Sequence, residues 1–162
     1  NDVFDCQVPA IERNGGEVLK FIGDGLLAIF PIEGTAKTLT ETCDAALAAA
    51  KGALEDLATL NASRAKSGHE PIRFGLALHI GEVAYGNIGG NNRLDFTCIG
   101  PAVNIASRLE GLTGKVGRPV VVSEDVARAS TRPTERLGDF ELKGVPQAQA
   151  VYAPTEGLLS SW

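Results

Sequence analysis

Two short apolar segments joined by a glycine–aspartate–glycine turn place the strongest constraint on the fold of this chain. Residues 18–22 and 26–30 are rich in Val, Leu, Ile and Phe, and Gly23, Asp24 and Gly25 separate them. Aspartate next to glycine is typical of the tight turn of a β-hairpin. The two segments are therefore predicted to be antiparallel neighbours, so the fold contains a sheet.

Segments with helical and strand periodicity alternate along the rest of the chain. Residues 1–14 and the Ala-rich residues 40–65 are predicted helices, and Gly15 and Gly16 end the first one. The further predicted elements are strands at 72–81, 82–88 and 93–99, a turn at 89–92, a helix at 101–112, a strand at 119–122, a helix capped by Ser123 and ending near 129, and two strands between 135 and 153 around a turn at 144–146. Hairpin strands with helices between them predict an α+β sandwich built on a mixed, mostly antiparallel sheet.

The size and charge of the chain narrow the possible classes of function. The sequence has 162 residues and a formal net charge of −5, which fits one domain and argues against a general nucleic-acid-binding surface. No apolar run is long enough to span a membrane. The three cysteines, Cys6, Cys43 and Cys98, lack a C-x-x-C spacing, so we expect free, buried thiols in a reducing compartment.

Two charged residues of the predicted hairpin are candidates for binding chemistry. Asp24 at the tip presents a carboxylate on a short, rigid mount, which suits a hard divalent cation. Aspartate is equally an ordinary turn residue. Lys20 lies within an apolar strand, where it is either an edge charge that reaches water or a donor aimed into a pocket.

Asn104 and Arg108 form the second candidate group. They are four residues apart in a predicted helix, so their side chains share one face, opposite the apolar face of Val103, Ala106 and Leu109. An amide beside a guanidinium can hold a phosphate or an oxyanion. The alternative is a solvated polar face.

Three further residues have open interpretations. Thr97 is a good strand former, and Lys143 could meet a phosphate or lie in an exposed turn. His79 alternates with apolar neighbours and is expected to be a satisfied, half-buried histidine. It has no partner at metal-ligand spacing.

Taken together, these segments resemble the catalytic domain of the class III nucleotidyl cyclases, the adenylate and guanylate cyclases. The similar segments are GGEVLKFIGDGLLAIF at 15–30, FGLALHIGEVAYGNIG at 74–89 and FTCIGPAVNIASRLEGLTG at 96–114, in the order of the family. The similarity continues to LKGVPQAQAVY at 142–152 and so covers nearly the whole chain.

The resemblance implies a fold, an assembly and a reaction. The fold is a ferredoxin-like α+β sandwich, and the assembly is a head-to-tail homodimer with active sites at its interface. The reaction converts a nucleoside triphosphate to a 3′,5′-cyclic monophosphate and pyrophosphate, with two Mg²⁺ or Mn²⁺ ions assisting attack by the ribose 3′-hydroxyl. Neither nucleic acid nor a membrane is an expected partner of this domain.

The resemblance also assigns roles to individual residues. Asp24 matches the second of two metal-binding aspartates of the family. Asn104 matches the residue that orients the ribose, Arg108 the one that meets the phosphate, and Lys143 the lysine that binds the triphosphate.

Lys20 and Thr97 match the pair that selects the base. Adenine presents an acceptor at N1 and an amine donor at N6, so a lysine donor and a threonine hydroxyl acceptor complement it. We therefore expect ATP rather than GTP as substrate. The Lys/Thr pair resembles that of a bacterial-type subgroup.

This chain departs from the family pattern at the N-terminal end of the chain. The first metal aspartate of the family lies roughly 44 residues before the second, which is upstream of residue 1. We therefore expect residues 1–162 to be a catalytic domain that lacks an N-terminal strand, so only one metal carboxylate is present. Pro101 and Glu82 also differ from residues common in the family, which affects the finer details of triphosphate binding.

Other classes of function remain alternatives at this point. A degenerate cyclase-homology domain would serve only in nucleotide binding or dimerisation, and a guanylate cyclase would use GTP. A diguanylate cyclase shares a Gly-Gly-Glu segment, but Lys20 and the helix of Asn104 and Arg108 disfavour it. We expect a cytoplasmic location for the domain.

Overall fold

The computed structural model describes the backbone of residues 1–87 and 96–162, and the side chains of 1–84 and 99–162. Its elements are α1 Asp2–Arg13, β1 Glu17–Ile22, β2 Gly25–Ile29, α2 Leu39–Lys66, β3 Leu76–Leu78, β4 Ala84–Asn87, β5 Phe96–Ile99, α3 Pro101–Glu110, α4 Thr113–Val116, β6 Val120–Ser123, α5 Glu124–Ala129, β7 Thr134–Phe140, β8 Gln149–Pro154 and the 3₁₀-helix η1 Gly157–Leu159. The turn predicted at 89–92 lies outside the described residues.

The described strands form three sheets rather than the single predicted one. A four-stranded sheet has the order β3-β6-β8-β7, and β1-β2 and β4-β5 are separate two-stranded sheets. Only the β3–β6 pairing is parallel among the described pairs. The predicted α+β class and the mixed, mostly antiparallel pairing are confirmed.

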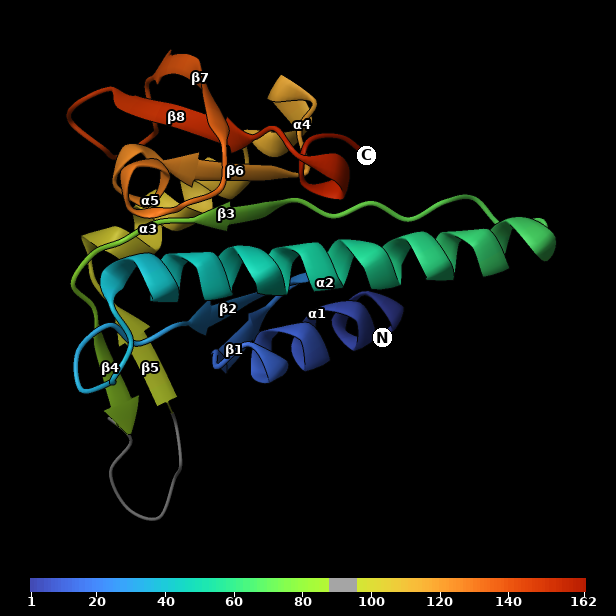
Figure 1. Cartoon of the computed structure of the whole chain (residues 1–162), viewed down its shortest axis with the longest axis horizontal. Helices are drawn as coiled ribbons and strands as arrows, with labels where there is room; N and C mark the ends of the chain where they lie inside the picture. The colour runs from blue at the N-terminus through green and yellow to red at the C-terminus, as the bar shows by residue number, and fades with distance from the viewer. Residues whose placement is uncertain (88–95) are drawn as a thin grey trace.

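The long helix α2 separates the four-stranded sheet from the layer of α1, β1 and β2 (Figure 1). It begins with a capping box, in which Thr38 Oγ1 accepts from the Glu41 N–H and Glu41 Oε1 accepts from the Thr38 N–H. Leu47, Leu54 and Leu57 are buried along it and form an apolar stripe at helical spacing.

Strand β6 is the centre of the core. Val120 and Val122 belong to the apolar cluster that includes α2, whereas Val121 belongs to a second cluster with Leu109 of α3. All three valines are fully buried. Because successive side chains point to opposite faces of a strand, α2 packs on one face of the sheet and α3 on the other. The side of α3 that points away from the sheet is left exposed.

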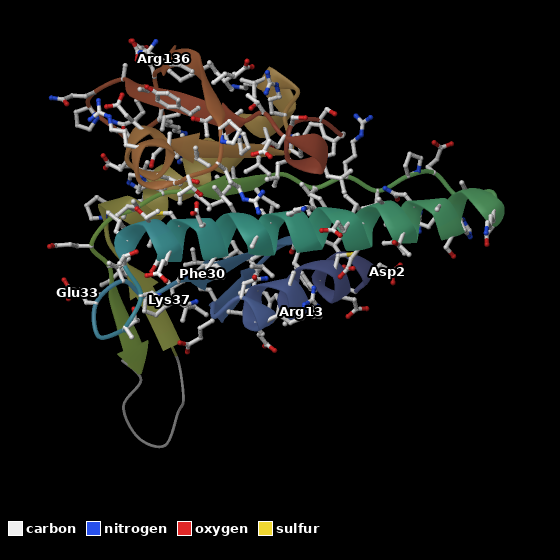
Figure 2. All side chains as sticks on the ribbon, viewed as in Figure 1. Asp2, Arg13, Phe30, Glu33, Lys37 and Arg136 are labelled. Atoms are coloured by element: carbon white, nitrogen blue, oxygen red, sulfur yellow. The ribbon has the colours of Figure 1, made fainter. Side chains whose placement is uncertain are left out.

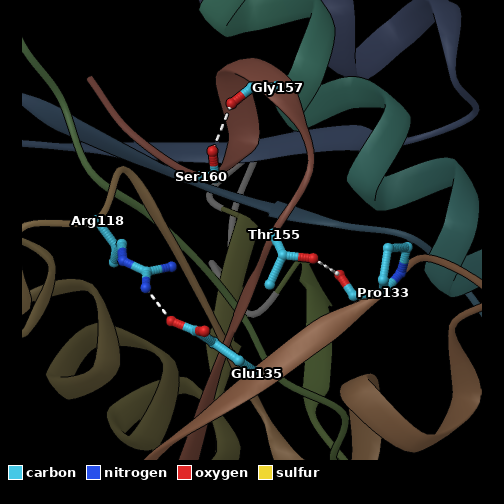
Figure 3. A network of polar contacts seen from close by, with 6 residues as sticks. All are labelled: Arg118, Pro133, Glu135, Thr155, Gly157 and Ser160. Atoms are coloured by element: carbon cyan, nitrogen blue, oxygen red, sulfur yellow. Dashed lines mark hydrogen bonds and ion pairs between the residues drawn. The ribbon is translucent and has the colours of Figure 1, made fainter.

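Polar contacts tie the outer strand β7 to its surroundings (Figure 3). Arg118, just before β6, forms an ion pair with Glu135 of β7. Thr155, which follows β8, donates its backbone N–H and its hydroxyl to the Pro133 carbonyl, at 3.1 and 3.3 Å. The start of β7 is thus held on two sides.

The predicted strand at 72–81 is too long at both ends, because only Leu76–Leu78 form β3. The side chain of Asn61 in α2 donates to the Ile72 carbonyl and accepts from the Ile72 N–H, each at 2.8 Å. These bonds use the backbone groups that a strand would offer to a neighbouring strand.

One smaller expectation changes and another is confirmed for the described residues. Ser123 precedes α5 as predicted, but its hydroxyl makes no capping bond, and its buried Oγ has no partner among the described residues. Cys6 and Cys43 are free and buried, as predicted, and burial raises the pKa of both thiols. The side chain of Cys98 lies outside the description. Across the described part of the chain, no helix combines the length and apolar character needed to cross a membrane.

The single tryptophan packs against the segment that leads into β3. Trp162 Nε1 donates to the Phe74 carbonyl at 3.2 Å, and the Arg73 guanidinium lies 5.4 Å from the centre of its ring. The C-terminal segment is therefore attached to the residues that lead into β3.

Candidate active site

Asp24 lies at the exposed turn between β1 and β2. Ile22 pairs with Gly25, so Gly23 and Asp24 alone connect the strands. Gly23 has φ +55°, a conformation that favours glycine. The predicted hairpin is confirmed, and its carboxylate is free to meet a ligand from solvent.

Lys20 lies in β1 opposite Leu27, next to a register shift that begins at Val18. Its side chain is half-buried. Strand β1 contacts β5, the strand that contains Thr97. The side chain of Thr97 lies outside the described residues, so its predicted role stays a prediction.

Asn104 and Arg108 are both exposed on α3, as their spacing predicts. Leu109 on the other side of the helix is fully buried against the four-stranded sheet. Gly100 forms the N-cap and Pro101 the first helical residue, where the missing N–H of proline has no cost. The polar face of α3 is therefore held out to solvent by a well-packed apolar face.

Lys143 lies in the loop between β7 and β8. Leu142 before it is buried, and the Val145 N–H donates to the Leu142 carbonyl at 3.0 Å, which closes a turn. Gly144 in this turn has φ +81°. The turn leaves the Lys143 side chain exposed.

The predicted site residues thus fall into separate groups within one chain. Lys20 and Asp24 belong to the β1–β2 hairpin, whereas Asn104, Arg108 and Lys143 belong to α3 and the loop of the four-stranded sheet. Among the described side chains, no hydrogen bond or ion pair joins one group to the other.

The carboxylate of Asp24 fits one position in the shell of a divalent cation, since such ions prefer oxygen ligands. Within the described ranges, no group of three or more His, Cys, Asp and Glu side chains could hold a metal ion. Asp24 therefore fits as one ligand of a metal site and not as the whole site.

Sequence reasoning missed a group of exposed apolar residues near the hairpin. Phe21, Ile22 and Ile99 expose 55%, 54% and 55% of their surface. The first two lie on β1 and the third on β5, and these strands are in contact. An apolar strand end beside a polar turn is the sequence signal that could have revealed the exposure of Phe21 and Ile22.

His79 is half-buried, as predicted, but it is not satisfied. Its Nδ1 is buried and has no hydrogen-bond partner among the described residues. Burial lowers the pKa of this imidazole, and Asp125 acts in the opposite direction. A neutral ring is therefore favoured at neutral pH.

Comparison with known proteins assigns the family. The family described as "Adenylate and Guanylate cyclase catalytic domain" matches residues 1–154. The chain belongs to this cyclase family. This result confirms the expected class III cyclase type.

Relatives of this cyclase include proteins named adenylate cyclases. The chain is 36% identical over 161 residues to an adenylate cyclase of Anabaena cylindrica, covering 94% of the chain and 30% of the relative. It is 30% identical over 159 residues to adenylate cyclase 1 of Rhizobium meliloti, covering 94% of the chain and 23% of the relative. The chain thus spans less than a third of the length of these two relatives.

Solved cyclase structures have the same fold. A bacterial light-regulated adenylyl cyclase matches with a TM-score of 0.76 and 27% identity, covering 99% of this chain and 44% of that one. The guanylyl cyclase Cya2 matches with a TM-score of 0.78 and 26% identity, covering 99% and 82%. Structures named for adenylyl and for guanylyl activity are therefore similarly close to this cyclase.

Proposed function

We propose that this cyclase converts ATP to 3′,5′-cyclic AMP and pyrophosphate, in cytoplasmic signal transduction. The main support for ATP as substrate is the contact between β1 and β5, because it brings the strand of Lys20 beside the strand of Thr97, the proposed base-selecting pair. The relatives named as adenylate cyclases support the same choice. Lys20 would donate to adenine N1, and the Thr97 hydroxyl would accept from the N6 amine.

In the proposed reaction, the ribose 3′-hydroxyl loses its proton, its oxygen bonds to the α-phosphorus, and pyrophosphate leaves. Asn104 orients the ribose and Arg108 stabilises the charge that develops on the phosphate. Removing a donor of this kind costs about 2.7–4 kcal/mol of barrier. Lys143 binds the triphosphate. Asp24 would hold a divalent ion, Mg²⁺ or Mn²⁺, which lowers the pKa of the attacking hydroxyl and neutralises phosphate charge.

We also propose that two copies associate head-to-tail, with the active sites at their interface. The exposed apolar side chains of Ile22 in β1 and Ile99 in β5 support this, because apolar surface left exposed is typical of contact surfaces. The separation of the Asp24 hairpin from the face of Asn104 and Arg108 within one chain agrees with a site shared between copies.

The test is to incubate the purified full-length protein with Mn²⁺ and either ATP or GTP and to separate the products by chromatography. Cyclic AMP as the main product supports the proposal. Cyclic GMP would instead show a guanylate cyclase, and cyclic di-GMP a diguanylate cyclase. No product from either nucleotide, by a protein that still binds ATP, would show a binding or dimerisation module.

A further inference from the structure

Two glycines on either side of β3 let helix α3 approach the sheet closely. Neither Gly75 nor Gly81 has a positive φ, so neither is needed for its conformational freedom. A Cβ on Gly81 would overlap the Cβ of Ala102, and a Cβ on Gly75 would lie 2.8 Å from the Cβ of Thr113. Real Cβ atoms essentially never approach another atom so closely, so the absence of a side chain is what these positions require.

The two contacts lie at the start of α3 and just beyond its end. Ala102 is in the first turn of α3, and Thr113 begins α4, three residues after Glu110. Between them, α3 contacts β3 and β6, and its Leu109 is fully buried. The glycines therefore set the height of both ends of the helix above the sheet.

The start of α3 is held on a second side as well. Gly100 has φ +148°, and a Cβ there would lie 3.0 Å from the Glu82 carbonyl oxygen. Its carbonyl accepts from the Val103 N–H at 3.1 Å. Residues 81–83 thus pack against the start of α3 and fix the position of its first turn.

Asn104 and Arg108 project from α3 between these two supports. A helix rises about 1.5 Å per residue, so Arg108 lies about 9 Å along the axis from Ala102. To restore an ordinary contact beside a new Cβ on Gly81, the first turn would have to move by about 1 Å. A misplacement of about 1 Å in a catalytic group can cost about 100-fold in rate.

We propose that Gly75 and Gly81 are positioning residues, which fix α3 so that Asn104 and Arg108 reach the reacting phosphate and ribose. This inference rests on the proposed cyclase function. The glycines themselves touch neither substrate nor metal. They act through the distance between β3 and α3.

The decisive variant is Gly81→Ala, with Gly114→Ala as the matched control. Gly114 lies in α4 and has nothing within 4 Å of an added Cβ. Gly81→Ala is expected to lower kcat for cyclic AMP formation by about 10- to 100-fold with KM changed by less than about threefold, because interactions made only in the transition state appear in kcat. The control is expected to stay within about twofold of the wild type.

A second substitution tests whether the contact with Ala102 is the cause. Ala102→Gly in the Gly81→Ala background removes the Cβ that the new side chain meets. We expect kcat to return to within about threefold of the wild type. Kinetics measured well below the thermal unfolding midpoint of each variant separate a displaced helix from a loss of folded protein. If Gly81→Ala does not fold, Ala102→Val enlarges the same contact from the helix side and is expected to lower kcat in the same way.

Amide NMR shifts of residues 102–109 give a readout that does not depend on activity. They are expected to move in Gly81→Ala and to return in the double variant. Unchanged kcat in folded Gly81→Ala, or no rescue by Ala102→Gly, would overturn the positioning role. If the wild type makes no cyclic nucleotide, the proposed function fails. In that case, unmoved α3 amides in Gly81→Ala would separately overturn the placement of the helix by this contact.

Discussion

Asp24, Asn104 and Arg108 are exposed side chains on well-packed elements, so function and folding can be separated at these residues. An exposed residue that loses no buried contact changes the free energy of unfolding by less than about 0.5 kcal/mol. Substitutions here therefore test chemistry with little effect on the fold.

Arg108→Ala is expected to lower kcat by about 100- to 1,000-fold, because the developing charge on the phosphate loses its donor. Asp24→Asn is expected to abolish turnover by removing a metal ligand. Steady-state kinetics with Mn²⁺ and ATP measures both, and the thermal unfolding midpoint should stay near the wild-type value. The exposed Arg128 of α5 offers a matched control as Arg128→Ala. Retained activity in Arg108→Ala or Asp24→Asn would contradict the site assignment.

Lys20→Glu is expected to shift the ATP/GTP ratio of kcat/KM by at least about tenfold towards GTP. Guanine carries an N1–H donor, so a carboxylate can accept a hydrogen bond from it, whereas an ammonium is itself a donor and cannot. Lys37 lies in the loop after β2 (Figure 2). Lys37→Glu therefore makes an equal change of charge outside β1 and should leave the ATP/GTP ratio unchanged. An unaltered ratio in Lys20→Glu would show that this lysine does not read the base.

At the scale of the elements, Asp44 fastens the loop after α5 to the start of α2. Its carboxylate accepts from the Ser130 hydroxyl at 2.7 Å, the Thr131 N–H at 3.0 Å and the Thr131 hydroxyl at 2.6 Å. Burial alone would raise the pKa of Asp44, but the hydrogen bonds from Thr131 and Ser130 outweigh it and hold the pKa below its ordinary value.

The lowered pKa of Asp44 predicts a pH-dependent contribution to stability. The folded state holds this proton less tightly than the unfolded state, so the contribution is full above the unfolded pKa, about 3.9, and is lost as the pH falls through the folded value. Asp44→Asn is expected to lower the free energy of unfolding by about 1–3 kcal/mol at pH 7. The difference from the wild type should shrink below about pH 4.

Urea denaturation at pH 7 and at pH 3 measures this difference. Glu55→Gln removes an exposed carboxylate from the same helix α2 and is the control, with an expected effect below about 0.5 kcal/mol. A difference between Asp44→Asn and the wild type that is equally large at both pH values would contradict the role of the ionised carboxylate.

The turn between α1 and β1 explains why two glycines stand there. A Cβ on Gly16 would lie 2.6 Å from Phe30 Cζ and 2.7 Å from Ile11 Cγ2, so no side chain fits. Gly15 has φ +86°, a backbone conformation that favours glycine. Phe30 is labelled in Figure 2. Sequence reasoning assigned these glycines to the end of a helix, and the structure adds a packing requirement at Gly16.

The elements that the sequence predicted best are those whose signals are local. The capping box at Thr38 and the leucine stripe of α2 determine a long helix, and the Gly23–Gly25 turn determines a hairpin. The extent of β3 could not be predicted, because it depends on the hydrogen bonds between Asn61 and Ile72, residues eleven positions apart. Helix α4 has four residues and no side-chain cap, so it left no signal.

In the candidate site, too, local features were predictable from the sequence and the contacts between distant segments were not. The shared face of Asn104 and Arg108 follows from helical spacing, and the exposure of Asp24 follows from its turn. Which elements lie together does not follow from spacing, because the contact between β1 and β5 joins segments far apart in the chain. The roles of Lys20, Thr97 and Lys143 came from the family resemblance and stay predictions.

At the scale of the whole molecule, the exposed apolar side chains of Ile22 and Ile99 on the contacting strands β1 and β5 predict association of two copies. Ile22→Lys would bury an unpaired charge in that contact, which costs several kcal/mol. We expect the dimer dissociation constant to rise by more than about 100-fold and cyclic AMP formation to fall with it. Sedimentation velocity over a range of concentrations measures the first effect.

Leu158→Lys is the control for this prediction, because Leu158 is an exposed apolar residue on η1 with 40% of its surface accessible. It should leave the association unchanged. If Ile22→Lys sediments as the wild type does, Ile22 does not lie in the contact surface between copies.

The attachment of Trp162 to the Phe74 carbonyl gives the molecule a built-in optical reporter. Trp162 is the only tryptophan of the chain, so its fluorescence comes from one place. That place adjoins Gly75, which supports one end of α3. A shift of its emission on addition of nucleotide and Mn²⁺ would record, without any label, movement in the segment that leads from α2 into β3.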